Sequence, residues 1–138
     1  MKGSFLKYDL RRVANQLYYP SYLSFESALS YYGVLSQVPY TQTFATVKKS
    51  KKMVLGGTEV EFTQLKNRLF FGYEIREGFN IARAEKALLD QAYLTARGKR
   101  RLSYDGLDLS SINPDRLKKY AQKFPPYALE KLKEYKIL

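Results

Sequence analysis

Apolar residues at helical spacing predict that the chain begins with two amphipathic helices. In the first, the apolar positions recur at i, i+3, i+4 and i+7, and they are Leu10, Val13, Ala14 and Leu17. Pro20 cannot continue this helix, so the helix is expected to end near Tyr18. In the second helix, Ser24 is placed to cap the start and Gly33 to form the left-handed stop. Its apolar face consists of Phe25, Ala28, Leu29 and Tyr32.

From Val38 onward, apolar and polar residues alternate with a period of two, which is typical of strands. Gly56 and Gly57 separate two such segments, and this pair suits a tight hairpin because both glycines can adopt positive φ. The segments with strand character are 43–48, 53–55, 58–65, 69–76 and 79–81. Short strands that follow one another through turns predict a central, mainly antiparallel sheet of about four or five strands.

A long helix is predicted after the sheet, over residues 83–97, with Gly98 as its stop. Helical spacing places Lys86 and Asp90 on its polar side, so both are predicted to contact solvent or a partner. Glu85 falls among the apolar residues of the opposite side. There it is expected to fix the strand-to-helix junction, by accepting backbone N–H bonds or by pairing with a buried arginine.

Two further helices are predicted near the C-terminus, at 114–124 and 127–136, the first with Asn113 as its cap and Pro114 at its start. The predicted fold class is therefore α+β. It has two N-terminal helices, the central antiparallel sheet, the long helix after it and a helical C-terminus. At 138 residues, the chain is predicted to form a single domain over residues 1–138.

The composition narrows the classes of function. The chain has no cysteine and no histidine, which excludes disulfides, structural zinc and an imidazole base. No catalytic residue, metal site or cofactor is predicted. The enzyme alternative is a carboxylate-bound divalent cation held by Glu59, Glu61 and Glu74, although exposed glutamates on strands are also ordinary surface features.

No apolar run approaches the roughly 20 residues that a membrane-spanning helix needs. Residues 1–10 also lack the apolar stretch and cleavage site of a signal peptide. The protein is therefore predicted to be soluble and cytoplasmic, with no membrane partner.

The net charge of +11 favours a polyanionic partner such as DNA or RNA. Two basic clusters are the predicted nucleic-acid contacts. The first consists of Lys48, Lys49, Lys51 and Lys52, and the second of Arg97, Lys99, Arg100 and Arg101. Two alternatives remain at this point. Lysines also protect an exposed strand edge from pairing, and cations at a helix C-terminus are favoured by the helix dipole alone.

Aromatic residues are abundant, with 13 tyrosines and 8 phenylalanines. Most at helical spacing are expected in the core. Tyr19, Tyr22 and Tyr31 lie off the predicted apolar face of the second helix, so they are predicted to contact a partner, as are Lys86 and Asp90.

Three motifs follow one another along the chain. YYPSYLSFESALSYYG spans residues 18–33 and is followed by the Val38-Pro39 pair, FFGYE spans 70–74, and IARAEKALLD spans 81–90. In this order they resemble the antitoxin domain of the AbiEi family. The resemblance covers residues 8–98, whereas the C-terminal helices at 107–138 match only in general character. The family usually has proline where this chain has Ala84.

The resemblance implies a non-enzymatic antitoxin of a type IV toxin–antitoxin system, which acts in phage abortive infection. Such an antitoxin antagonises a nucleotidyltransferase toxin of the AbiEii family without a stable complex. Family members also repress their own promoter through an N-terminal winged helix, but only Met1 to Lys7 precede the first predicted helix here. The chain is expected to be either a fragment of a longer antitoxin or a stand-alone version. The alternative function is a basic nucleic-acid-binding accessory module or a fragment of a transcriptional regulator.

Overall fold

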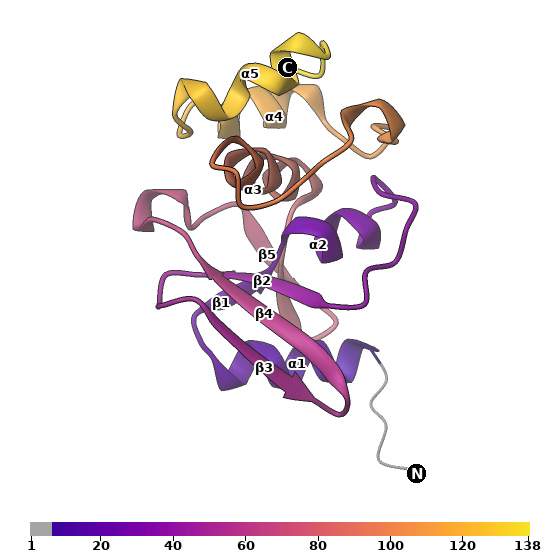
Figure 1. Ribbon diagram of the computed structural model, residues 1–138, viewed down its shortest axis with the longest axis vertical. Coiled ribbons are helices and arrows are strands. Elements are labelled where there is room, and N and C mark those ends of the chain that lie inside the picture. Colours follow the sequence, from indigo (N-terminus) through magenta and orange to yellow (C-terminus); the bar gives the residue numbers. More distant parts are fainter. Residues whose placement is uncertain (1–6) are drawn as a thin grey trace.

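The computed structural model describes residues 7–138, in which a mixed sheet carries helices on both faces (Figure 1). The strands are β1 (Ser21–Leu23), β2 (Gln42–Thr46), β3 (Lys51–Leu55), β4 (Thr58–Gln64), β5 (Tyr73–Arg76) and β6 (Phe79–Ala82). Their order across the sheet is β3-β4-β2-β1-β6-β5, so β3 and β5 are the two edges. The helices are α1 (Lys7–Leu17), α2 (Phe25–Tyr31), α3 (Ala84–Ala96), α4 (Pro114–Ala121) and α5 (Pro126–Glu134), with short 3-10 turns η1 (Asn67–Leu69) and η2 (Tyr104–Gly106).

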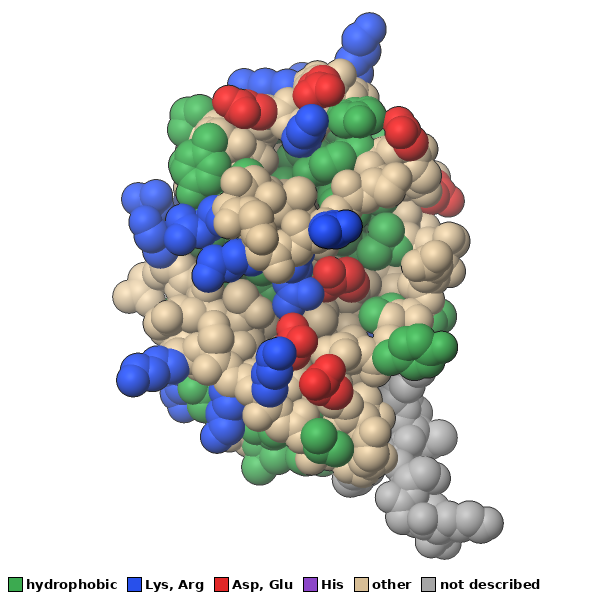
Figure 2. Space-filling model, viewed as in Figure 1, with side chains coloured by type: hydrophobic (Ala, Val, Ile, Leu, Met, Phe, Trp, Pro, Cys, Tyr) green, Lys and Arg blue, Asp and Glu red, His purple; other side chains and the backbone are tan. Residues whose placement is uncertain are grey.

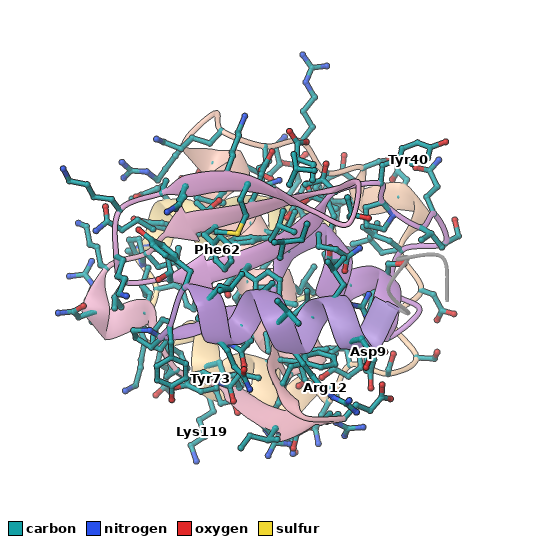
Figure 3. All side chains as sticks on the ribbon, turned by 90° about the horizontal axis from the view of Figure 1, so that it is seen from below. Asp9, Arg12, Tyr40, Phe62, Tyr73 and Lys119 are labelled. Carbon is teal, nitrogen blue, oxygen red and sulfur yellow. The ribbon has the colours of Figure 1, made fainter. Side chains whose placement is uncertain are left out.

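The helices form layers on the sheet. Helix α1 packs against β1 and β6 on one face, and Figure 3 shows it crossing in front of the sheet. Helices α2 and α3 cover the other face, and α4 and α5 pack on the outer side of α3 (Figure 1). Helix α3 is therefore a middle layer, and eleven of its 13 residues are buried.

The predicted sheet of four or five mainly antiparallel strands is wrong, because the structure has a mixed sheet of six strands. Strand β1 lies between the two N-terminal helices, where no strand was expected. It pairs antiparallel with β2 and parallel with β6, while β2 and β4 are also parallel. With only three residues, all buried, β1 shows no alternation that a sequence pattern could detect.

The predicted hairpin turn is present between β3 and β4. Gly56 and Gly57 have φ values of 56° and 82°, a region that glycine adopts without steric cost. The two strands pair antiparallel from Leu55 and Thr58 outward. Because β3 is an edge strand, its lysines lie where an edge is otherwise open to pairing with another chain.

No helix within residues 7–138 has both the length and the apolar character of a membrane crossing. Residues 1–6 lie outside the described part of the chain, and with them most of the stretch from which the absence of a signal peptide and of a winged helix was predicted.

Candidate nucleic-acid interface

A polar groove of about 630 Å³ lies where three parts of the chain meet. It is lined by the β2–β3 turn, by the end of β4 with the residues that follow it, and by the last turn of α3 with the residues that follow it. The residues that line it are Val47, Ser50, Thr63, Gln64, Leu65, Lys66, Asn67, Tyr93, Leu94, Arg97 and Lys99. Figure 2 shows Lys and Arg side chains gathered along the left side of the molecule, where Figure 1 places the β2–β3 turn and the segment after β4. We call this feature the basic groove.

Hydrogen bonds join the β2–β3 turn to the end of β4, and both line the basic groove. The backbone N–H of Gln64 donates to the Ser50 hydroxyl at 2.9 Å, and the Gln64 side-chain amide donates to the Val47 carbonyl at 2.9 Å. At the neighbouring positions, the Leu65 N–H donates to the Thr46 carbonyl at 2.7 Å. The β2–β3 turn and the end of β4 are therefore held together at Gln64 and Leu65.

Arg97, one of the residues that line the basic groove, lies beside two tyrosine side chains. Its guanidinium lies 5.5 Å from the centre of the Tyr93 ring, and it donates to the Tyr127 hydroxyl over 3.4 Å. This hydrogen bond lowers the pKa of Tyr127, and the charge of Lys66 acts in the same direction. Tyr127 belongs to α5, but the cations that lower its pKa come from the residue before η1 and the residue after α3.

The first predicted basic cluster is divided between two places. Lys48 and Lys49 are exposed in the β2–β3 turn, next to the groove residue Ser50. Lys51 and Lys52 lie in the edge strand β3, and Lys52 is 3.9 Å from the Glu61 carboxylate. The edge-protection alternative therefore describes Lys51 and Lys52, while the position of Lys48 and Lys49 suits contact with a phosphate backbone.

The second predicted cluster is also divided. Arg97 and Lys99 line the basic groove, and Arg101 is exposed. The prediction for Arg100 is wrong. Its side chain is only 14% exposed and lies 2.8 Å from Glu26 and 3.0 Å from Glu61.

The Arg100 guanidinium also lies 5.0 Å from the centre of the Phe25 ring. Arg100 thus ties the segment after α3 to α2 and β4. The carboxylates of Glu26 and Glu61 neutralise its positive charge, so this charge is no longer available to bind a phosphate.

Sequence reasoning missed the middle of the basic groove. Lys66 and Asn67 line it, and Arg68 is exposed in the same turn. Two cations separated by one residue form no cluster in the sequence. The only signal was their position directly after a predicted strand, where side chains of a connecting loop tend to be exposed.

A second cluster of charged residues is fully buried between the sheet and α3. Lys86 and Asp90 are both 0% exposed, and their Nζ and Oδ1 atoms are 2.6 Å apart. Lys86 also donates to the Tyr22 hydroxyl at 2.6 Å. The other oxygen of Asp90 accepts from the hydroxyls of Tyr22 and Ser24, each at 2.8 Å. We call these four residues the buried network.

Aromatic rings surround the ammonium group of Lys86. It lies 5.1, 4.7 and 5.5 Å from the ring centres of Tyr22, Phe71 and Phe124. Burial lowers the pKa of Lys86 and raises the pKa of Asp90, while each partner opposes the change in the other. Burial, followed by the charge of Asp90, also raises the pKa of Tyr22. Three donors on one carboxylate and the rings around the cation offset the loss of water from both ions.

The predicted partner contacts at Tyr22, Lys86 and Asp90 are therefore wrong, because none of the three reaches the surface. Helical spacing assumes that the polar side of a helix faces solvent, but this side of α3 faces Tyr22 of β1 and the rings of Phe71 and Phe124. Tyr22 belongs to the strand β1, so helical spacing does not apply to it and cannot predict which way its side chain faces.

Glu85 is buried as predicted, but it fixes a different junction. Its Oε2 accepts the backbone N–H of Asn113 at 2.7 Å, and its Oε1 lies 3.6 Å from Arg116, which is half-exposed. The carboxylate therefore joins the start of α3 to the cap of α4 rather than to the preceding strand. Its arginine partner is not buried.

Tyr19 and Tyr31 are the remaining predicted partner contacts. Tyr19 is 59% exposed. Tyr31 is half-buried, with its hydroxyl 3.4 Å from Glu77 and its ring 5.1 Å from that of Tyr32. Tyr19 keeps the exposure that a partner contact needs, whereas Tyr31 has part of its surface covered by neighbours from this chain.

The three glutamates of the enzyme alternative do not converge. Glu59 and Glu61 are on β4, and Glu74 is on β5, with three strands between them. Glu61 is paired with Arg100 and Glu74 with Arg76. Within residues 7–138 no group of three acidic residues is placed to hold a metal ion.

Neither a family model, nor a curated protein, nor a solved structure was found to match this chain.

Proposed function

We propose that this chain is the antitoxin domain of a type IV toxin–antitoxin pair, as its resemblance to the AbiEi family implies, and that it contacts nucleic acid through the basic groove. In this proposal it has no catalytic activity of its own and acts in the cytoplasm. It antagonises a nucleotidyltransferase toxin without a stable complex, through the toxin's target or product, and contributes to repression of its own promoter.

The observation that supports the antitoxin proposal is the meeting of the three motifs. Tyr22 from the first motif stacks on Tyr73 from the second, with ring centres 4.8 Å apart. Phe71 of the second motif lies against Lys86 of the third. Lys86 and Asp90 bind Tyr22 and Ser24. Segments that are up to 68 residues apart thus build one buried centre, and this is a reason for such motifs to occur together.

Co-expression tests the antitoxin proposal. An AbiEii-type nucleotidyltransferase toxin is induced in bacteria with and without this chain, and growth is followed after induction. Growth arrest is expected to be relieved by the intact chain. Persistent arrest, with the chain shown to be folded and abundant, would contradict the proposal.

The basic groove supports the nucleic-acid contact specifically. It brings Lys66, Arg97 and Lys99 from two separate segments into one recess, with Lys48 and Lys49 on the neighbouring turn. Cations that gather in this way attract a phosphate backbone and release its counterions, so affinity should fall steeply as salt is added.

A salt titration tests this contact. Binding of a labelled oligonucleotide is measured for the intact chain, for the variant K66A/R97A/K99A and for a control of equal charge, K118A/K119A/K133A, whose lysines are exposed on α4 and α5. The groove variant is expected to lose affinity and about two units of the log–log salt slope, since each phosphate contact contributes roughly 0.7 to 0.9. Equal losses in both variants would show that the basic groove has no special role.

A further inference from the structure

The basic groove has the dimensions of a pocket rather than of a surface that follows a duplex. Its volume of about 630 Å³ falls in the range of roughly 300 to 1,000 Å³ that is typical of sites for small molecules. A duplex carries its phosphates on the outside of a wide cylinder, and its bases are reached by an element that protrudes into a groove about 12 Å wide. In this chain Lys66, Arg97 and Lys99 line a recess. A strand whose nucleotides can turn inward would place its phosphates on these cations and its bases in the recess.

The basic groove also presents uncharged groups that can bind the edge of a base. Asn67 lines it with an exposed carboxamide, which can both donate and accept hydrogen bonds. The Gln64 amide already donates to Val47, so its position is fixed. In single strands the Watson–Crick edges of the bases are free to meet such groups, whereas in a duplex these edges are paired.

An aromatic ring lies beside Arg97, one of the residues that line the basic groove. It belongs to Tyr127, which itself lines a separate pocket. Tyr127 is 42% exposed, its hydroxyl accepts from Arg97, and its ring centre is 6.2 Å from that of Tyr93. In Figure 2 hydrophobic side chains lie directly above the basic ones on the left, where Figure 1 places α5. A ring held beside a guanidinium provides a stacking surface for a base next to a contact for its phosphate.

From these features we infer that the basic groove binds single-stranded nucleic acid, with a base stacked on Tyr127 and the adjoining phosphates on Lys66, Arg97 and Lys99. This inference rests on the proposed nucleic-acid contact and adds the class of ligand. Asn67 hydrogen-bonds the edge of a base in the groove. Duplex DNA or RNA binds only through the charge of the surface, without the stacking contact.

Fluorescence anisotropy tests the inference with four probes of about 10 nucleotides, a length within the usual site sizes for single strands. They are a single-stranded DNA, a single-stranded RNA of the same sequence, and the DNA and RNA duplexes. At equal salt, at least one single strand is expected to bind more tightly than its duplex. Whichever single strand binds more tightly identifies the sugar that the groove prefers.

The variant Y127L separates stacking from charge. It is expected to weaken single-strand binding by roughly tenfold, the effect of losing one stacked base, and to leave duplex binding unchanged. The matched control is Y40L, because Tyr40 is 98% exposed and Figure 3 shows it at the upper right of the molecule. Y40L should change neither single-strand binding nor duplex binding. N67A changes a residue of η1 rather than of α5, and it should weaken single-strand binding severalfold even if Y127L unfolds the C-terminal helices.

Two results would overturn the inference, and only one of them would also contradict the proposed nucleic-acid contact. Duplex binding as tight as single-strand binding, with no effect of Y127L or N67A, would refute the single-strand inference and leave the nucleic-acid contact intact. If none of the four probes binds at low salt, the proposed nucleic-acid contact fails as well.

Discussion

Replacing Lys86 by methionine should destabilise the fold strongly, because the change removes one charge of a fully buried pair. Lys86 makes two hydrogen bonds of 2.6 Å, to Asp90 and Tyr22, and none of its side chain is exposed. Without the ammonium group, the Asp90 carboxylate keeps only the hydroxyls of Tyr22 and Ser24 as donors. Breaking a buried pair in this way typically costs about 3 to 5 kcal/mol.

This magnitude is large compared with the total stability of a domain, which is about 5 to 15 kcal/mol. If Lys86 and Asp90 were an exposed i, i+4 pair, as helical spacing predicted, the loss would be no more than about 0.5 kcal/mol. The two possibilities therefore differ by roughly tenfold in free energy. Urea unfolding followed by circular dichroism resolves a difference of this size.

A double-mutant cycle with K86M, D90L and K86M/D90L completes the measurement. Methionine and leucine fit the ring-lined site without charge, so the double variant should cost less than the sum of the two single variants, by about 1 to 3 kcal/mol. A cost below about 1 kcal/mol for K86M, or strict additivity in the cycle, would refute the view that the buried network acts as a unit.

Three further predictions concern the surroundings of the buried network. E85A should lower the melting temperature by several degrees, because the Asn113 N–H loses its acceptor, which costs about 1 to 3 kcal/mol. An unchanged melting temperature together with lost toxin antagonism would show that Glu85 has a functional role instead. G72A should lower stability by at least about 1 kcal/mol in urea unfolding, because Gly72 has a φ of 76° and its added Cβ would lie 3.0 Å from the Lys86 Cγ; stability equal to wild type would contradict this. Burial raises the pKa of Tyr32 from its usual value of 10.0 to about 12 in the folded state. The contribution of Tyr32 to stability is therefore complete below pH 10.0 and should be lost as the pH rises from 10.0 to about 12. The stability difference between wild type and Y32F should therefore shrink between pH 10.0 and about 12, and a constant difference would contradict the assignment.

The local pattern predicted where the strong helices and the hairpin occur. The helix expected at 83–97 corresponds to α3 at Ala84–Ala96, and the turn at Gly56 and Gly57 joins β3 to β4. These features depend on neighbours within one or two turns of the chain, so their residues are close together in the sequence. The failure at β1 has the opposite cause, since a strand of three residues is held by β2 and β6 rather than by its own sequence.

The basic groove shows how far a search for charge clusters can go. Both predicted clusters contribute residues to the groove or to its neighbouring turn, but Arg100 is withdrawn into ion pairs and Lys66 was not expected. A run of cationic residues in the sequence shows that positive charge is present, but it does not show whether that charge is available to a ligand. Which cations remain available to a ligand depends on the carboxylates that the fold places beside them.

The sequence by itself determined the composition-based limits, the main helices and the net charge of +11, because these follow from residue types and short-range spacing. Only the tertiary structure decided that Lys86 and Asp90 belong to the core. On an isolated helix their side would face water, but in the fold it faces Tyr22 of β1 and the rings of Phe71 and Phe124. Once water is excluded, two charges must find partners within the protein, and the hydroxyls of Tyr22 and Ser24 provide them.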